Sequence, residues 1–396
     1  MKRIYPIIAS QYEAIIASSQ NSMKYIWQKK GWPKLLWQND KLVAQLGKVR
    51  LCQGGLMNRV KSLGFNVKEA RSEVLVHETI KTSAIEGTIV DPAAVRSSVA
   101  KRLGLPSAGL TTPDRYIDGM IDVLLDATTR HQAPLTTQRL KGWQAALFPT
   151  GFSGIHPVRV GKWRGAQPMQ ILSGPLGRER IHYEAPPHNR IDKEMHQFLS
   201  WWAKSLGKMD GLIRAGVAHF YFITIHPFED GNGRMARAIT ECALAQDEQK
   251  EERFYSLSSQ IMAERKAYYD VLESSQKGTN DITSWLQWFL GCLERALQNS
   301  EKIISRVLAK NDFWHHFANV SINDRQRKVI NRLLDAGTGG FEGGLTTRKY
   351  VGLTKASRAT AFREINDLLE KGILKKNEGA GRNVSYQLRF EKKDVP

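Results

Sequence analysis

The stretch HPFEDGNGRMAR, residues 226–237, lies between two apolar segments, LIRAGVAHFYFITI before it and RMARAITECALAQ at its end. Pro227 directly follows His226 and disfavours the α conformation there, so a helix over the first segment is predicted to end at about His226. A second helix is predicted to begin at about Gly233. The stretch therefore reads as a glycine-containing loop between two helices and indicates a mainly helical fold.

The loop has the composition of an anion-binding site. Gly231 and Gly233 flank Asn232, and glycine permits positive φ and a close approach of the backbone to a ligand. The N–H groups and the positive dipole end of the second helix would face whatever occupies the loop. Arg234 and Arg237, three residues apart, are expected to project from nearly the same face and to donate to phosphate oxygens.

Two further side chains of the loop predict chemistry. Asp230 supplies the oxygen ligand that Mg²⁺ prefers, beside the expected phosphates. His226 has an ordinary pKa of about 6.5 and is suited to accept a proton from an attacking hydroxyl. Because His226 lies at a helix end, His226 and Asp230 do not have the spacing of zinc ligands stacked on one helix. The residues together predict transfer from a nucleotide polyphosphate to a hydroxyl.

Two alternatives compete with this interpretation. GNGRMA also fits the dinucleotide-binding pattern G-x-G-x-x-G/A, with YFITI as its strand and Glu251 or Glu252 about twenty residues further on. The surroundings lack alternating strands and helices, which disfavours that alternative, and no G-x-x-x-x-G-K-[ST] phosphate loop occurs. A purely structural turn is the other alternative, and it leaves the density of functional residue types unexplained.

Length and composition indicate a globular protein of two or three folded units, with 396 residues, 41% hydrophobic and 24% charged. No run of about 18 apolar residues occurs, and the N-terminus lacks an export signal, so we expect no membrane span and a cytoplasmic protein. Cys52, Cys242 and Cys292 form neither a disulfide framework nor a metal-binding spacing. The net charge of +19 favours polyanionic partners without selecting one.

Three regions are expected along the chain. Residues 1–95 have mostly helical patterns, and one helix is predicted to end at Gly87. Residues 96–300 alternate helices with loops and contain one hairpin at about 169–187, an isolated β element of the kind that serves as a binding flap. Residues 310–396 have the order helix, helix, helix, hairpin, which is typical of a winged helix-turn-helix, and the first of these helices is predicted to stop at Gly337.

The third region could bind DNA through residues 320–390. Residues 321–396 hold 16 Lys and Arg against 9 Asp and Glu, a net charge of +7. Such modules also bind protein or dimerise, so the partner stays open. The basic residues expected near the recognition helix and the wing are Arg348, Lys349, Arg358, Arg363 and Arg382.

The loop resembles the signature of the Fic family, H-P-F-x-[DE]-G-N-G-R-x-x-R, at every defined position. The resemblance extends to the hairpin, to YSLSSQIMAERKAYYDVL, to NDITSWLQWFL and to the Trp-rich segment near the N-terminus. It implies a mainly α fold: a Fic-type helical core over 96–300 with a β-hairpin flap, a helical N-terminal region and a C-terminal winged helix-turn-helix.

Most members of that family transfer AMP from ATP to a Ser, Thr or Tyr hydroxyl of a protein. The resemblance implies that His226 is the general base, that Asp230 binds Mg²⁺ and that Phe228 is a structural plug under the loop. A target, or the chain itself, would dock as a strand along the flap near 169–187. The resemblance implies that the nucleotide contacts Gly231, Asn232, Gly233, Arg234, Met235, Ala236, Arg237 and Tyr269, with Asn232 positioning the α-phosphate and the two arginines meeting the β- and γ-phosphates. The resemblance also places Tyr268 at the nucleotide pocket, and packing in the helix core is the alternative interpretation of this residue.

The segment TSAIEG resembles the inhibitory motif [ST]-x-x-x-E-[GN] of one class of the family, with Thr82, Glu86 and Gly87 at its defined positions. A carboxylate delivered to Arg237 would occupy the guanidinium that the γ-phosphate needs. We therefore expect an enzyme restrained by its own N-terminal region.

Three alternatives remain open at this point. Some relatives remove AMP from modified proteins, and others transfer phosphate or phosphocholine, with the same loop. A DNA-binding regulator with a nucleotide-sensing Fic core is a different class of function, compatible with the basic third region. Dimerisation is common in the family, so a homodimer is also an expectation of the resemblance.

Overall fold

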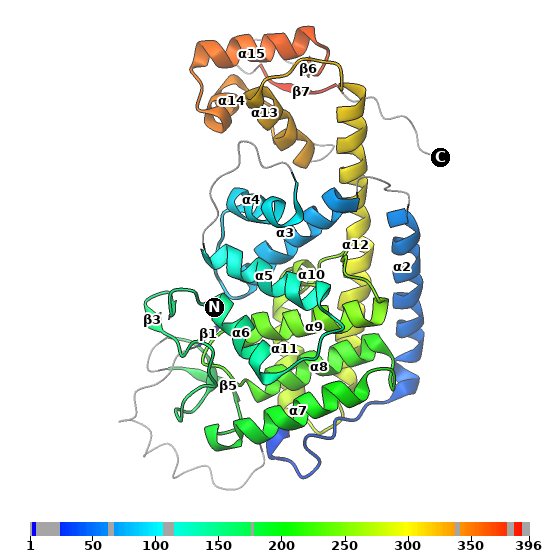
Figure 1. Ribbon diagram of the computed structural model, residues 1–396, viewed down its shortest axis with the longest axis vertical. Coiled ribbons are helices and arrows are strands. Elements are labelled where there is room, and N and C mark those ends of the chain that lie inside the picture. Colours follow the sequence, from blue (N-terminus) through cyan, green and yellow to red (C-terminus); the bar gives the residue numbers. More distant parts are fainter. Residues whose placement is uncertain are drawn as a thin grey trace. The chain divides into compact units, whose positions relative to one another are not determined.

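The computed structural model describes residues 2–4, 24–61, 67–105, 115–175, 178–336, 341–377 and 384–389. Within these ranges the chain is mostly helical with a few short strands, which confirms the predicted fold class (Figure 1). The chain divides into two compact units, so that the boundary expected at residue 95 falls inside the first. The first unit comprises Met1–Arg59, Arg71–Pro106 and Leu110–Ser300, and the second Val60–Ala70, Ser107–Gly109 and Glu301–Pro396.

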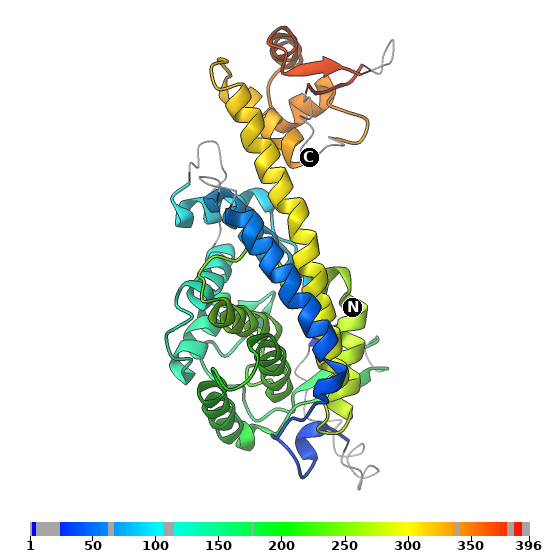
Figure 2. The same cartoon turned by 90° about the vertical axis from the view of Figure 1, so that its right-hand side faces the viewer.

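Helix α8 (Gly211–Ile225) is the buried centre of the first unit, because every residue from Leu212 to Ile225 is buried. It packs along α9 (Asn232–Glu248), whose residues 234–246 are also buried. A 34-residue helix, α12, runs unbroken past the expected end of the core at residue 300 (Figure 2). Helix α12 spans Thr283–His316, and the other α-helices described before it are α2 (Val43–Lys61), α3 (Val67–Ile85), α4 (Pro92–Leu103), α5 (Arg115–Thr129), α6 (Thr137–Leu147), α7 (Ile191–Ser205), α10 (Leu257–Ala263) and α11 (Arg265–Lys277).

The predicted hairpin forms from β4 (Gln170–Ser173) and β5 (Arg180–Glu184), which pair antiparallel. The expectation that it is an isolated β element is wrong. Strand β1 (Lys2–Ile4) pairs antiparallel with β4, and β2 (Phe152–Ser153) pairs with β3 (His156–Pro157) elsewhere in the unit. Strands of two or three residues are too short to produce a period-two pattern, which is why the sequence did not reveal them.

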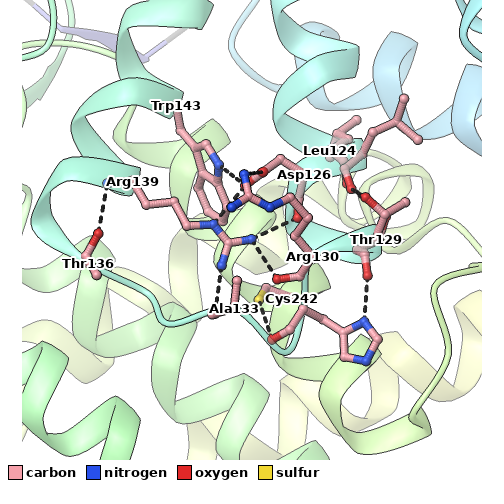
Figure 3. Close-up of polar contacts among 12 residues, drawn as sticks. Leu124, Asp126, Thr129, Arg130, Ala133, Thr136, Arg139, Trp143 and Cys242 are labelled. Atoms are coloured by element: carbon pink, nitrogen blue, oxygen red, sulfur yellow. Dashed lines mark hydrogen bonds and ion pairs between the residues drawn. The ribbon is translucent and has the colours of Figure 1, made fainter.

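The turn between α5 and α6 is fixed to α9 by buried polar contacts (Figure 3). Asp126 accepts hydrogen bonds from Arg139 Nε at 2.8 Å and from Trp143 Nε1 at 2.7 Å. Burial alone would raise the pKa of Asp126, but the hydrogen bonds from Arg139 and Trp143 outweigh it and lower that pKa. Gln246 of α9 donates to the backbone carbonyl of His131 at 2.6 Å, so the turn and the helix hold each other in place.

After α12, the described residues of the second unit form three helices followed by two antiparallel strands, in the order that the sequence predicts. Its core includes Val329, Ile330, Tyr350, Ile365 and Leu368. Gly337, the expected helix stop, and Arg382, the expected wing residue, lie outside the described residues. The elements are α13 (Asp324–Asp335), α14 (Thr347–Thr354), α15 (Arg358–Glu370), β6 (Leu374–Lys376) and β7 (Tyr386–Leu388).

Two expectations about the whole chain concern membranes and cysteines. Among the helices that the structure describes, none is both long enough and apolar enough to cross a bilayer. All three cysteines are free thiols, and Cys242 and Cys292 are buried. Burial raises the pKa of the Cys242 thiol to about 11, so this cysteine is a packing residue and not a reactive one.

Candidate functional site

The loop between α8 and α9 has the predicted ends. Helix α8 ends at Ile225, and His226 takes a left-handed conformation with φ 52°. Pro227 disfavours the right-handed helical conformation for the residue before it, which agrees with the end of the helix at this point. Gly231 has φ 89° and precedes the first residue of α9, so this glycine supplies the positive φ expected of it. The expectation of positive φ at Gly233 is wrong, because Gly233 lies in the first turn of α9.

Asn232 holds the loop in shape. Its side-chain oxygen accepts from the Phe228 amide at 3.0 Å, and its side-chain nitrogen donates to the Phe228 carbonyl at 2.7 Å. Phe228 is fully buried and packs against Trp163, with ring centroids 4.8 Å apart. Both the oxygen and the nitrogen of the Asn232 side-chain amide therefore bond the loop backbone. Asn232 would influence a ligand by holding that backbone in place.

His226 is a buried, neutral imidazole with one free nitrogen. Its Nδ1 lies 3.1 Å from the Ile223 carbonyl, which can only accept, so Nδ1 carries the proton and Nε2 presents a lone pair. Among the described residues, Nε2 has no hydrogen-bond partner. Burial, together with the positive charge of Arg164, lowers the pKa of His226 to about 4. A lone pair on a neutral, oriented imidazole is what proton abstraction requires.

Arg164 positions this loop and was not predicted. Its Nε donates to the His226 carbonyl at 2.8 Å, its backbone amide donates to the Pro227 carbonyl at 2.9 Å, and its Nη2 donates to Pro186. Burial lowers the pKa of Arg164 to about 10, so the guanidinium stays charged at neutral pH. Arg164 lies in the segment KWRG and belongs to no periodic pattern or motif, so the sequence alone does not indicate its role.

Arg234 and Asp230 form a second group at the start of α9. Arg234 donates to the Tyr116 hydroxyl at 3.1 Å and lies 3.4 Å from Asp230 Oδ1, and its guanidinium stacks 4.8 Å from the Phe148 ring. Asp230 Oδ2 accepts from Ser153 at 2.5 Å. Arg234 and Arg237 thus contact different groups, and a shared face for the two arginines stays a prediction.

Arg237 contacts the predicted inhibitory residues. Its Nε donates to Thr82 Oγ1 at 2.7 Å, its Nη2 donates to the Thr82 carbonyl at 3.0 Å, and Nη2 also pairs with Glu86 Oε1 at 2.7 Å. Although burial lowers the pKa of Arg237, the charge of Glu86 outweighs it and the net shift is upward. Among the described residues, Nη1 of this buried guanidinium has no partner, which leaves a donor available for an anion oxygen.

Helix α3 delivers the Glu86 carboxylate to this point. The helix ends at Ile85, Gly87 follows with φ 87°, and Arg265 Nε donates to the Ile85 carbonyl at 2.9 Å. A methyl group at position 233 would lie 2.2 Å from Glu86 Oε1, so the carboxylate rests directly against the first turn of α9. Gly233 is therefore needed for close approach, and the carboxylate occupies the place where a helix N-terminus attracts anions.

A cavity of about 60 Å³ adjoins these groups and is lined by Glu86, His226, Gly233, Tyr269 and Tyr268, among others. Burial raises the pKa of Tyr269 to about 12, so its hydroxyl remains protonated. The Tyr268 hydroxyl bonds His219 Nε2 at 2.9 Å within the core, which agrees with a packing role for this tyrosine.

The side chains of Met235 and Ala236 are fully buried, so a ligand could reach these residues only through their backbone.

The donor set fits Mg²⁺ only in the company of phosphates. Among the described residues no cluster of three His, Cys, Asp or Glu side chains could hold a metal. Asp230 is 27% exposed and is the loop carboxylate beside Arg234. Mg²⁺ commonly takes one or two protein carboxylates and completes its shell with phosphate and water, and Asp230 fits that arrangement.

Five residues that the sequence assigns to the site lie around one loop in the structure: His226, Asp230, Arg237, Thr82 and Glu86. Sequence reasoning missed the groups that support them, namely Ser153, Tyr116, Phe148 and Arg164. These come from segments 60 or more residues away in the chain with no motif of their own, so only tertiary structure identifies them.

The chain is similar in fold to a solved Fic family structure. A Fic family protein from Desulfovibrio desulfuricans G20 aligns with a TM-score of 0.50 and 16% identity over 92% of this chain and 100% of that one. The Fic/DOC family model matches residues 134–244, and a domain of unknown function, DUF4172, matches residues 25–105. Residues 134–244 of this chain are therefore similar to a Fic/DOC domain.

Two curated relatives are called protein adenylyltransferase Fic. That of Nematostella vectensis is 22% identical over 241 residues, covering 58% of this chain and 50% of the relative. That of Aedes aegypti is 23% identical over 251 residues, covering 61% of this chain and 44% of the relative. The match thus spans half or less of these relatives' length.

Proposed function

We propose that this protein is an adenylyltransferase that transfers AMP from ATP to a Ser, Thr or Tyr hydroxyl of a protein, including its own chain. The observation that carries the proposal is the free Nε2 of His226 in the cavity beside the N-terminus of α9. A base next to an anion-binding helix end suits attack on a phosphate, and the relatives' name supports the same reaction.

In this mechanism the acceptor hydroxyl of a target protein gives its proton to His226 Nε2 while its oxygen attacks the α-phosphorus, and pyrophosphate leaves. The Ile223 carbonyl keeps the imidazole in the tautomer that can accept this proton. Arg164 and Asn232 fix the loop so that the backbone of Gly231 and Gly233 faces the phosphates.

Two arginines would hold the remaining phosphates. The free Nη1 of Arg237 is available to the γ-phosphate, and Arg234 lies beside Asp230 at the start of α9. Asp230 would hold Mg²⁺, which supplies positive charge to the phosphates when it is bound.

In this proposal Glu86 inhibits the transfer reaction. Its carboxylate pairs with Arg237 and rests against Gly233, where phosphate oxygens would otherwise bind. Removal of AMP by the same loop is the reaction that a failure of the transfer test would favour.

The test of the base uses α-labelled ATP, Mg²⁺ and a cell extract, with Glu86→Gly as the active background. Adding His226→Ala should reduce label transfer to extract proteins by at least about 100-fold while nucleotide binding persists. His196→Ala is the matched control, because His196 is exposed on α7. Full transfer by the His226→Ala variant would show that His226 is not the base.

We propose a second function for the second unit: a winged helix that binds duplex DNA. The supporting observation is the exposed face of α15, which carries Arg358, Phe362 and Arg363, with Arg348 exposed on α14. Guanidinium groups on one helix face suit phosphate and base-edge contacts. Lys349 is committed to the carbonyls of Glu342 and Gly344 and is not part of this face.

A further inference from the structure

A second chain of polar groups runs through the flap at the edge of the cavity. Ser173 Oγ lies 2.5 Å from His182 Nε2, and His182 Nδ1 lies 2.5 Å from Glu273 Oε2. Ser173 belongs to β4, His182 to β5 and Glu273 to α11. A hydroxyl, an imidazole and a carboxylate in this order form the arrangement of an activated nucleophile, its base and the group that orients the base.

His182 owes its position to an irregularity of the sheet. Ile171 pairs with Tyr183 and Leu172 pairs with Ile181, so His182 is the extra residue of a bulge on β5. A bulge re-aims a side chain out of the regular alternation. The His182 side chain lines the same cavity as His226 and Glu86.

Glu273 fixes the tautomer of His182. A carboxylate only accepts, so the proton between them sits on His182 Nδ1 and a neutral His182 presents its Nε2 lone pair to the Ser173 hydroxyl. Burial opposes ionisation of Glu273, but hydrogen bonds from Lys277 and His182 hold its pKa at about 2. Lys277 Nζ at 2.8 Å and Arg180 Nη2 at 3.6 Å share the other oxygen of this carboxylate.

Ser173 contacts a residue that lines the cavity, because its hydroxyl meets His182. Side chains two residues apart on a strand share a face, and Ile171, two residues before Ser173, lines the cavity with His226. Ser173 is half-buried, so its hydroxyl is not sealed in the core. Anchoring the flap to α11 needs only the His182–Glu273 pair, and the hydroxyl aimed at Nε2 is additional to that anchor.

We propose that Ser173 is the residue on which this chain modifies itself, with His182 as its base and Glu273 as a positioning residue. The inference rests on the proposed adenylyl transfer. The bond from Ser173 Oγ to the α-phosphorus of ATP forms, the bond from that phosphorus to the bridging oxygen of pyrophosphate breaks, and the hydroxyl proton passes to His182 Nε2. The products are a phosphodiester at Ser173 and pyrophosphate, and no oxidant or reductant is needed.

The experiment incubates the full-length Glu86→Gly protein with α-labelled ATP and Mg²⁺, alone and with a cell extract, and maps the AMP adduct by mass spectrometry. We expect the adduct on Ser173. Ser173→Ala should remove that adduct, and His182→Asn should reduce it about 100-fold, because Asn keeps a donor for Glu273 and lacks the base. Ser274→Ala is the matched control, since Ser274 is exposed on α11 and its hydroxyl donates to the backbone carbonyl of Val271 in the same helix.

The outcomes separate this inference from the function on which it rests. Label on extract proteins with none on Ser173 overturns the inference and leaves adenylyl transfer in place. An adduct on Ser173 that is undiminished in His182→Asn overturns the role of His182. Absence of label from both the chain and the extract overturns the inference and the proposed function together.

Discussion

The His226 imidazole is neutral because it is buried, and this sets the pH range in which it can act as a base. Its pKa is lowered to about 4, whereas an exposed histidine titrates at about 6.5. We predict that the rate of label transfer by the Glu86→Gly variant stays level from pH 8 down to about 5. Single-turnover rates across this range would measure it, and a tenfold loss between pH 7 and 5.5 would contradict it.

Gly233 serves both the restrained and the active state. A methyl group there would lie 2.2 Å from Glu86 Oε1 and 3.2 Å from Arg237 Nη1, so it would displace the carboxylate and also fill the phosphate site. We predict that Gly233→Ala, unlike Glu86→Gly, does not raise transfer and weakens nucleotide binding, measured by calorimetry. Gly142→Ala in α6 is the control, since nothing lies within 4 Å of a methyl group there. Activation by Gly233→Ala would refute this assignment of the phosphate site.

At the scale of elements, β1 occupies an edge of the flap. Lys2, Arg3 and Ile4 pair with Ser173, Leu172 and Ile171 of β4, which is the edge where an extended target segment would add as a strand. We predict that deleting Lys2–Ile4 in the Glu86→Gly background raises labelling of extract proteins several-fold, read from gel autoradiography.

The control for this deletion keeps the backbone and changes only side chains. Lys2→Ala with Arg3→Ala should leave labelling near that of the parent, because strand addition uses main-chain groups. An unchanged signal after the deletion would mean that β1 does not compete with targets.

The long elements and the loop were predictable from sequence, and the support around them was not. Pro227 and Gly231 mark the end of α8 and the start of α9 through local backbone restrictions, which act within a few residues. The contact of Glu86 with Arg237 was predicted by resemblance to a motif across 151 residues of chain. Arg164 and strand β1 have no such local or motif signal, because their roles depend on partners far away in sequence.

At the scale of the whole molecule, buried neutral histidines make stability depend on pH. Burial lowers the pKa of His226 to about 4 and that of His219 to about 3, against about 6.5 in an unfolded chain. Below pH 6.5 these histidines bind protons in the unfolded chain but stay neutral in the folded one. The free energy of unfolding therefore decreases as the pH falls toward 4. We predict that denaturant unfolding shows a loss of about 3 kcal/mol from His226 alone over this range.

A variant checks that this loss comes from the histidine. His226→Asn should reduce the dependence on pH between 6.5 and 4, whereas substitution of the exposed His196 by Asn should not. Equal pH dependence in all three proteins would contradict the assignment.

DNA binding by the second unit is also testable in the full chain. We predict that Arg358→Ala with Arg363→Ala weakens binding to duplex DNA and reduces the salt slope by about 2, because two phosphate contacts are lost. Lys193→Ala with Lys208→Ala removes the same charge from exposed positions of the first unit and is the matched control. Fluorescence anisotropy at several salt concentrations would measure this, and equal slopes for both double variants would exclude α15 as the contact surface.

The central claim is that the Glu86 carboxylate restrains adenylyl transfer by occupying Arg237 and the first turn of α9. The most direct measurement is label transfer from α-labelled ATP by the wild-type protein, Glu86→Gln, Glu86→Gly and the control Glu69→Gln, whose carboxylate is exposed on α3. We predict wild-type activity for Glu69→Gln, an intermediate rise for Glu86→Gln and the largest rise, at least tenfold, for Glu86→Gly. Equal transfer by the wild-type protein and Glu86→Gly would contradict the claim.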